Sequence, residues 1–305
     1  MQETSAARPV RLADTGALLI VILLVVDSLH FVFARMLLPL MPPAVSALYI
    51  MAVGTVEVAV FGLFRKRIHL ATLLRQRWFF LAIGFLVAVS TILNYVAVEF
   101  IDPGTASLLG KTSLLFGLGI GMVWLRERLT RTQAGGALLA LAGVGVITFQ
   151  PGDYLSRGAL MVLASAFLYA IHAALTKRYG GEIDFVDFFF FRLLCTTGFM
   201  LLLVAGSQPL VWPTPPVLTL LILVGTVDVV ISRTIYYAVL RRMSVSLLSI
   251  VLTLSPVAAA AWSLALFGVW PTSQQLLGGA AVLLGVGVVA VAQPADQGPR
   301  TKDQG

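Results

Sequence analysis

The chain has 305 residues, of which 59% are hydrophobic and 11% are charged, and its mean hydropathy is +0.95. These values exclude a soluble globular domain and place the chain among polytopic membrane proteins. The formal net charge of +7 does not indicate nucleic-acid binding, because the basic residues gather in short loops between apolar segments. The single cysteine, Cys195, excludes an internal disulfide bond and a cysteine metal cluster.

Ten apolar segments are expected to span the bilayer as helices, since a span needs about 20 apolar residues. The first follows two basic residues and has no small-residue cleavage site, so we interpret it as a retained span and not a signal peptide. In chain order, the expected spans are 15–37, 44–64, 78–99, 104–123, 132–149, 157–177, 186–206, 216–239, 246–267 and 273–292.

The loops between these segments predict the orientation, because cytoplasmic loops retain lysine and arginine. If the N-terminus is cytoplasmic, 16 of the 21 basic residues lie on the cytoplasmic side. The opposite loops offer little beyond Arg157, with Arg35 near an outer helix end. We therefore expect a multi-pass protein of the plasma membrane with both termini in the cytoplasm.

The chain also repeats itself at an offset of 142 residues, which pairs His30 with His172 and Thr55 with Thr197. The repeats are expected over residues 15–149 and 157–292, between a cytoplasmic arm (1–14) and a cytoplasmic tail (293–305). Each unit holds five expected spans, and units with an odd number of spans enter the bilayer from opposite sides. Such an inverted repeat is typical of transporters that work by alternating access around a midplane site.

Several runs of residues resemble the drug/metabolite transporter (DMT) superfamily, EamA type. They are Asn94-Tyr95-Val96-Ala97, Leu125-Arg126-Glu127-Arg128-Leu129-Thr130, the glycine-rich run from Gly136 to Val146, and a weaker second copy that includes Leu254-Ser255-Pro256. The resemblance implies an all-α integral membrane fold of ten transmembrane helices, arranged as two inverted-topology five-helix repeats. It also implies a secondary carrier that often exports amino acids or other small metabolites. The sequence departs from the family pattern at Lys111, where the family usually has an apolar residue.

Ionisable side chains within spans are costly and therefore mark candidate functional sites. Asp27 and His30 lie three residues apart, on one face of the first helix. Asp27 either binds a cation, a substrate ammonium group or a proton, or it only holds helices together by pairing with a base such as Lys111. Lys111 either offers a positive charge to a substrate carboxylate or phosphate, or extends outward along the lipid face.

The remaining candidates each have two interpretations. His30 and His172 titrate near neutral pH and could respond to protonation, or they are neutral rings bonded to neighbouring helices. Glu57 is either a second titrating group or the partner of Arg192. Asp228 and Arg233 are five residues apart, about 140° around a regular helix, so we expect them to point to different helices or to a cavity.

Tyr95 and Tyr236 either line the substrate path or anchor helix ends at the interface. The expected substrate-binding residues are Asp27, His30, Lys111, Tyr95, Tyr236 and Asp228, and the expected coupling or charge-pair residues are Glu57, His172, Arg192 and Arg233. The sequence contains no nucleotide-binding loop and no HExxH motif, so we expect no cofactor, no metal and no catalytic residue.

The sequence thus favours a non-enzymatic carrier of a small polar or zwitterionic metabolite, such as an amino acid, that works as an exporter. An exchanger of organic anions or phosphorylated metabolites is the alternative, and a membrane-embedded lipid enzyme or a scaffold is the alternative from another class. The expected partners are the substrate, the lipid bilayer and protons, with no nucleic acid, in a monomer or homodimer.

Overall fold

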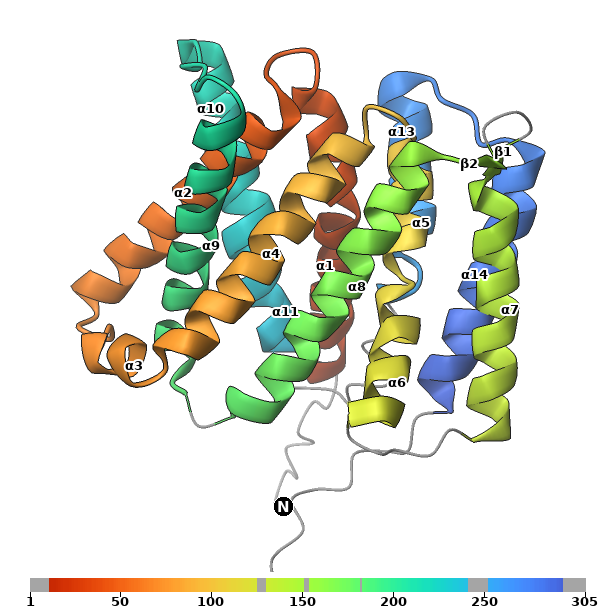
Figure 1. Cartoon of the computed structure of the whole chain (residues 1–305), viewed down its shortest axis with the longest axis horizontal. Coiled ribbons are helices and arrows are strands. Elements are labelled where there is room, and N and C mark those ends of the chain that lie inside the picture. Colours follow the sequence, from red (N-terminus) through yellow and green to blue (C-terminus); the bar gives the residue numbers. More distant parts are fainter. Residues whose placement is uncertain (1–10, 125–129, 151–153, 182, 241–251, 293–305) are drawn as a thin grey trace, which may run out of the picture.

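The computed structural model describes residues 11–124, 130–150, 154–181, 183–240 and 252–292, and these residues form a bundle of helices (Figure 1). The first half contains α1 (Arg11–Leu37), α2 (Pro43–Phe64), α3 (Leu70–Arg75), α4 (Arg77–Ala97), α5 (Pro103–Gly110), α6 (Ser113–Trp124) and α7 (Arg131–Thr148). A two-residue strand pair, β1 (Phe149–Gln150) with β2 (Tyr154–Leu155), joins it to the second half. The second half contains α8 (Arg157–Tyr179), α9 (Phe185–Ser207), α10 (Pro215–Val224), the π-helix η1 (Gly225–Ile231), α11 (Ser232–Leu240), α13 (Ser255–Phe267) and α14 (Ser273–Val291).

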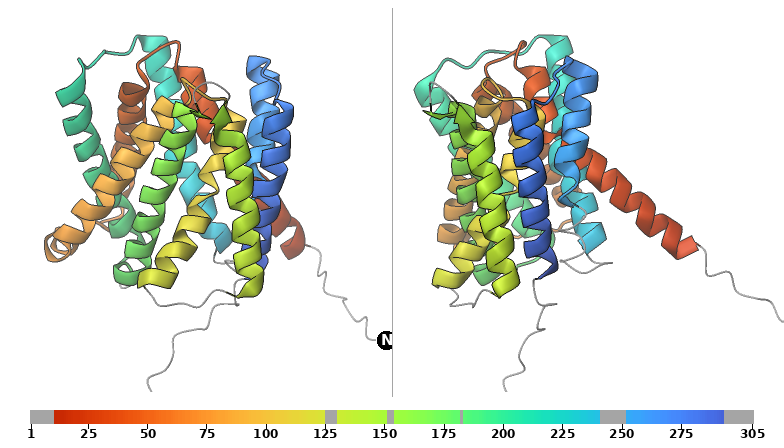
Figure 2. Two further views of the ribbon diagram at one scale, coloured as in Figure 1. Left: turned by 45° about the vertical axis from the view of Figure 1, so that its right-hand side comes forward. Right: turned by 90° about the vertical axis from the view of Figure 1, so that its right-hand side faces the viewer.

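Eight helical segments are long and apolar enough to cross a bilayer, and their bounds agree closely with the expected spans. The segment expected at 44–64 is α2, Pro43–Phe64, and the one expected at 157–177 is α8, Arg157–Tyr179. Two further apolar helices, Arg131–Ile147 and Ser255–Phe267, are shorter. The chain is thus a multi-pass, helical membrane protein, and the count of ten spans stays a prediction. The N-terminal part of α1 leans away from the other helices (Figure 2).

The fourth expected span is broken, which the sequence analysis did not anticipate. Its helix stops after Gly110, Lys111 and Thr112 form a turn, and α6 starts at Ser113. The Thr112 backbone N–H and hydroxyl both donate to the Leu109 carbonyl, at 3.0 and 2.7 Å, so the turn satisfies a carbonyl at the end of α5. A turn at Thr253 and Leu254 precedes α13 in the same way. Both turns lie 142 residues apart and therefore occupy equivalent positions of the repeat.

Several contacts between the two halves have a counterpart in which each helix is replaced by the equivalent helix of the other repeat. The contact of α1 with α13 corresponds to that of α6 with α8, and the contact of α2 with η1 corresponds to that of α4 with α9. Two contacts join equivalent helices directly, namely α2 with α9 and α7 with α14. At the first of these, the hydroxyls of Thr55 and Thr197 lie 2.8 Å apart. In Figure 1, α7 and α14 run side by side in opposite directions.

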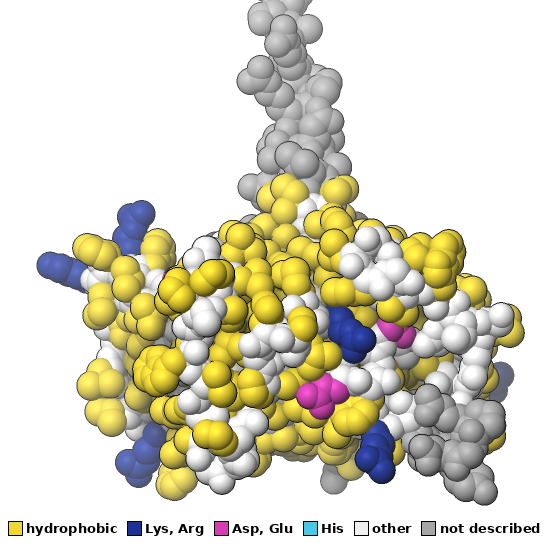
Figure 3. Space-filling model, turned by 90° about the horizontal axis from the view of Figure 1, so that it is seen from above, with side chains coloured by type: hydrophobic (Ala, Val, Ile, Leu, Met, Phe, Trp, Pro, Cys, Tyr) yellow, Lys and Arg dark blue, Asp and Glu magenta, His cyan; other side chains and the backbone are white. Residues whose placement is uncertain are grey.

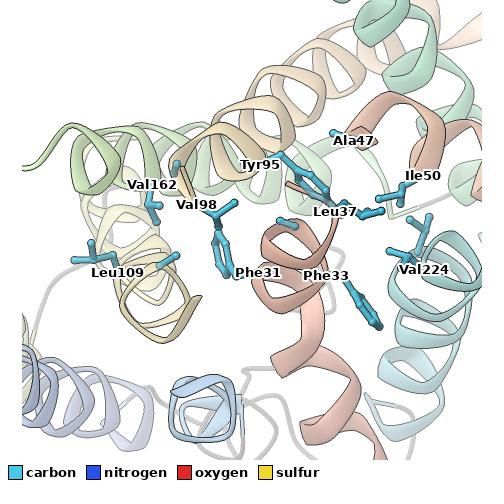
Figure 4. Packing of buried hydrophobic residues seen from close by; sticks show 14 of the residues in the cluster. Phe31, Phe33, Leu37, Ala47, Ile50, Tyr95, Val98, Leu109, Val162 and Val224 are labelled. Carbon is cyan, nitrogen blue, oxygen red and sulfur yellow. The ribbon is translucent and has the colours of Figure 1, made fainter. Parts of the chain in front are cut away.

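A continuous apolar core runs through the centre of the bundle (Figure 4). Tyr95 of α4 is 1% exposed and extends toward α1, where Leu37 is fully buried. Hydroxyl groups also join helices in the interior of the bundle, where the hydroxyls of Ser90 and Ser165 connect α4 and α8 at 2.7 Å. Hydrogen bonds of this kind hold helices together where the lipid offers no water.

Glycines permit the close contact of α7 and α14. A Cβ atom at Gly143 would lie 2.5 Å from the Gly278 carbonyl oxygen, and one at Gly136 would lie 2.8 Å from the Gly285 carbonyl oxygen. Because Gly136 is equivalent to Gly278 and Gly143 to Gly285, these are two copies of one contact. The obstacles are backbone atoms, so side-chain rearrangement does not relieve them.

We expect Gly143→Ala to lower the free energy of unfolding by roughly 2–3 kcal/mol, because the new methyl group forces α7 away from α14. Gly145→Ala on the same helix is the matched control, because a Cβ atom there meets nothing within 4 Å. We expect this control to leave stability unchanged or to raise it by about 0.5–1 kcal/mol through helix propensity. Unfolding of both variants in detergent, followed by circular dichroism, measures the difference. Equal stability of the two variants would contradict the role of the glycine contact.

Candidate functional site

An ion pair joins Asp27 in the middle of α1 to Lys111 at the break between α5 and α6. The Lys111 Nζ atom lies 3.2 Å from the Asp27 Oδ2 atom, and the two side chains are 22% and 25% exposed. Lys111 lies in the turn that interrupts the helix, and its side chain extends from this turn to Asp27. Ser255, the first residue of α13, also lies near the Asp27 carboxylate. The pairing of Asp27 with Lys111 agrees with one of the two interpretations of Asp27.

A second pair joins His30, one turn further along α1, to Asp228 of η1. The His30 Nδ1 atom lies 2.9 Å from the Asp228 Oδ2 atom, and the Asp228 side chain is only 7% exposed. Asp228 lies within a π-helix, and single π-helical turns are frequent at functional sites. The sequence analysis named both residues but did not predict their contact.

The π-helix also changes the angle between Asp228 and Arg233. A regular helix separates them by about 140°, but π-helical turns bond residues five positions apart and rotate less per residue. Asp228 contacts His30 and Arg233 acts electrostatically on it, so both residues lie near His30. Arg233 lies close enough to Asp27, to His30 and to His172 to interact electrostatically with each of them.

Aromatic rings surround the histidine. The His30 ring packs edge-on against Tyr95 at 5.7 Å and against Phe31 at 5.1 Å between ring centroids. Tyr95 is therefore part of the interior and not an interface anchor. Its hydroxyl is buried and has no hydrogen-bond partner among the described residues. A buried hydroxyl of this kind offers a donor and an acceptor to a bound molecule.

The other expected residues lie around this region. Glu57 accepts a hydrogen bond from the Thr226 hydroxyl at 2.5 Å, a partner on η1 that the sequence analysis did not name. Arg192 of α9 is 8% exposed, lies over the Phe189 ring at 5.6 Å and acts electrostatically on His172. The Nε2 atom of His172 lies 3.5 Å from the Thr176 hydroxyl of the same helix.

Tyr236 lies in a different environment from Tyr95. It packs against a small apolar cluster in which Leu23 of α1 contacts Val239 of α11. This cluster is separate from the main core that contains Tyr95.

The five residues Asp27, His30, Lys111, Asp228 and Arg233 form what we term the central charge cluster. Asp27, His30, Lys111 and Asp228 lie well inside apolar helical segments, where the bilayer offers no water to stabilise a charge, and Arg233 lies near the end of the segment Pro215–Tyr236. The cluster contains two carboxylates, two permanent cations and one histidine, so it can receive groups of either sign. No group of three metal-ligating side chains occurs among the residues that the structure describes.

A further buried carboxylate, Asp187, was missed by the sequence analysis. It lies near the start of α9, is 2% exposed, and accepts hydrogen bonds from His69 and Thr72 of the α3 region. No sequence signal marks it, because Asp184 three residues earlier is the helix cap and an acidic residue in a first turn is ordinary.

Comparison with known proteins gives consistent matches. The profile of the EamA-like transporter family matches residues 14–149 and again residues 156–291. The Uncharacterized transporter YdfC of Bacillus subtilis (strain 168) is 28% identical over 208 residues, which are 67% of this chain and 68% of that protein. One solved structure, described as the crystal structure of a protein, has a similar fold with a TM-score of 0.63. Its sequence is 19% identical, and the match covers 91% of this chain and 97% of that chain.

Proposed function

Because the chain belongs to the EamA-like transporter family, we propose that it is a secondary transporter of a small zwitterionic metabolite, such as an amino acid. The observation that carries this proposal is the Asp27–Lys111 ion pair in the middle of the bundle. A zwitterion presents an ammonium group to Asp27 and a carboxylate to Lys111. Each residue therefore still contacts a group of opposite charge when the Asp27–Lys111 ion pair separates. Binding then avoids the cost of a buried unpaired charge.

Alternating access is the proposed mechanism, with the central charge cluster as the site that opens to each side in turn. Three features support it: the helix breaks at equivalent positions, the opposite directions of α7 and α14, and the matched contacts between the halves. Transporters built from inverted repeats place their sites at such discontinuous helices near the midplane.

The proposed orientation has both termini in the cytoplasm of a plasma-membrane protein. The exposed basic side chains of the α2–α4 connection and of the C-terminal end of α8 lie at the lower end of the bundle in Figure 1. The opposite end shows few charged side chains among hydrophobic and uncharged groups (Figure 3). This asymmetry favours a cytoplasmic lower end. The direction of transport, export in our proposal, depends on gradients.

An exchanger of organic anions is the second candidate, because Arg233 adds a second permanent cation near Asp27 and His30. Membership in a transporter family favours either carrier over a membrane-embedded lipid enzyme. The variant Lys111→Met distinguishes a transporter of anions or zwitterions from a transporter of cations. We expect the variant to lose substrate binding in the first case and to keep it in the second.

The test is uptake into sealed proteoliposomes of labelled amino acids, organic acids, sugar phosphates and cationic drugs, with and without a pH gradient. We expect saturable uptake of amino acids, and faster uptake when a proton gradient is imposed. Uptake restricted to organic acids or sugar phosphates would replace the proposal with the anion exchanger. No uptake of any compound, by protein that is folded in the same vesicles, would contradict a carrier of these classes.

A further inference from the structure

The connection between α2 and α4 is strongly basic and lies apart from the central charge cluster. The chain has no acidic residue between Glu57 and Glu99. Five exposed basic side chains surround α3, and we term them the basic rim: Arg65, Lys66, Arg67, Arg75 and Arg77. The uncompensated charge suits an anionic partner.

The basic rim is held in a fixed place by the buried carboxylate of Asp187. This carboxylate accepts a hydrogen bond from the His69 backbone at 2.8 Å and one from the Thr72 hydroxyl at 2.8 Å. The His69 Nδ1 atom lies 3.2 Å from its second oxygen. A helix of only six residues is not stable alone, so these contacts fix α3 against α9.

The apolar side chains of the same segment face outward. Leu70 is 62% exposed, Leu74 is 63% exposed and Trp78 is 74% exposed. The Arg77 guanidinium lies 5.8 Å from the centre of the Trp78 ring. Exposed leucine and tryptophan next to arginine are typical of segments at the level of the lipid headgroups. The fixed segment therefore combines an apolar surface for acyl chains with cations for headgroups.

A cavity of about 290 Å³ opens between this segment and the C-terminal end of α8. Its lining is Arg75, Gln76, Trp78, Phe79 and Tyr179. The guanidinium of Arg178 adds a further cation beside it, 5.5 Å from the centre of the Tyr179 ring. Guanidinium groups bind phosphate oxygens through two parallel hydrogen bonds, and Gln76 offers an amide donor to the same ligand.

We propose that this cavity and the basic rim bind the phosphate headgroup of an anionic phospholipid, whose acyl chains lie along Leu74 and Trp78. Basic loops also set the orientation of a membrane protein. That role requires neither a lined cavity nor a buried carboxylate that fixes the loop, and this segment has both. The inference does not depend on the substrate of the central charge cluster.

The experiment is a titration of the purified full-length protein in an uncharged detergent with phosphatidylglycerol, followed by native mass spectrometry. Phosphatidylcholine with the same acyl chains and inorganic phosphate are the parallel ligands. We expect phosphatidylglycerol to bind and the other two to bind at least tenfold more weakly. We expect Arg75→Gln to weaken phosphatidylglycerol binding about fivefold, as one basic residue near an anionic lipid surface predicts. Arg131→Gln, which removes one exposed charge at the start of α7, is the matched control and should change binding less than twofold.

The variant Asp187→Ala tests whether lipid binding depends on the fixed position of α3. It removes the contacts that hold α3, and it also removes a negative charge beside a site for anions. Attraction between charges alone predicts tighter binding, whereas the proposal predicts weaker binding because α3 is released. Thr72→Val removes a single hydrogen bond and should weaken binding in the same direction if Asp187→Ala does not fold.

Three results would overturn the proposal. They are equal binding of phosphatidylglycerol and phosphatidylcholine, equal losses in Arg75→Gln and Arg131→Gln, and displacement of the lipid by millimolar inorganic phosphate. The last would identify a general anion site.

Discussion

Asp27→Asn and Lys111→Met are each expected to lower transport at least tenfold, and the double variant is expected to remain inactive although it regains stability. Either single variant leaves one charge without its partner in the bundle. The free energy of unfolding should fall by roughly 2 kcal/mol, less than the 3–5 kcal/mol of a fully buried pair, because these side chains are 22% and 25% exposed. The double variant removes both charges and hence this penalty. Transport stays low because the substrate has lost the groups that bind it.

The measurements are uptake into proteoliposomes and unfolding in detergent of the three variants. Ser28→Ala is the control on the same helix, since the Ser28 hydroxyl donates only to the Val25 carbonyl of its own helix, at 2.7 Å. It should transport like the wild type. A double variant with wild-type transport would show that the ion pair only holds α1 against the α5–α6 break, and the proposed binding role would be wrong.

Asp228→Asn is expected to abolish the stimulation of transport by a proton gradient while exchange of substrate across the membrane continues. Asp228 faces His30 at 2.9 Å, with Tyr95 and Arg233 nearby, so a proton that arrives at this pair changes the balance of the whole central charge cluster. Asparagine keeps the size and an acceptor oxygen but cannot take up the proton. Coupling should therefore disappear before binding does.

Uptake driven by an imposed pH gradient is compared with exchange between equal substrate concentrations, which moves no net protons. Glu57→Gln is the matched control, because glutamine still accepts the hydrogen bond that Thr226 donates to Glu57. We expect this control to respond to the gradient as the wild type does. A normal response in Asp228→Asn, or a lost response in Glu57→Gln, would assign coupling to a residue other than Asp228.

The sequence predicted eight of the ten expected spans well because hydrophobic length is a local property. It also named the members of the central charge cluster, since an ionisable residue in an apolar run is visible without a structure. It named Lys111 as one possible partner of Asp27, but it did not predict the pair of His30 with Asp228, because that contact depends on a local departure from regular helix geometry. The break at Lys111 replaces the expected continuous helix, and the π-helix at Asp228 changes the direction of every later side chain. Neither departure has a proline at its position, and the glycines beside them, Gly110 and Gly225, occur among many other glycines in the apolar segments.

Asp187 illustrates a different limit. Its partners, His69 and Thr72, are 118 and 115 residues away in the chain, and nothing in the spacing connects them. Only the packing of α3 on α9 brings these residues together. Long-range polar contacts of this kind require the tertiary arrangement and cannot be inferred from periodicity.

The hydrogen bond between Thr55 and Thr197 has a consequence for the proposed transport cycle. These residues are equivalent in the two repeats, so the contact maps onto itself when the halves exchange conformations. The contact between α7 and α14 has the same property. By contrast, in the proposed cycle the contact of α1 with α13 must change into the arrangement that α6 now has with α8. We therefore expect the α2–α9 and α7–α14 pairs to be the stationary pivot of the proposed cycle, and α1, α6, α8 and α13 to be the parts that rock around it.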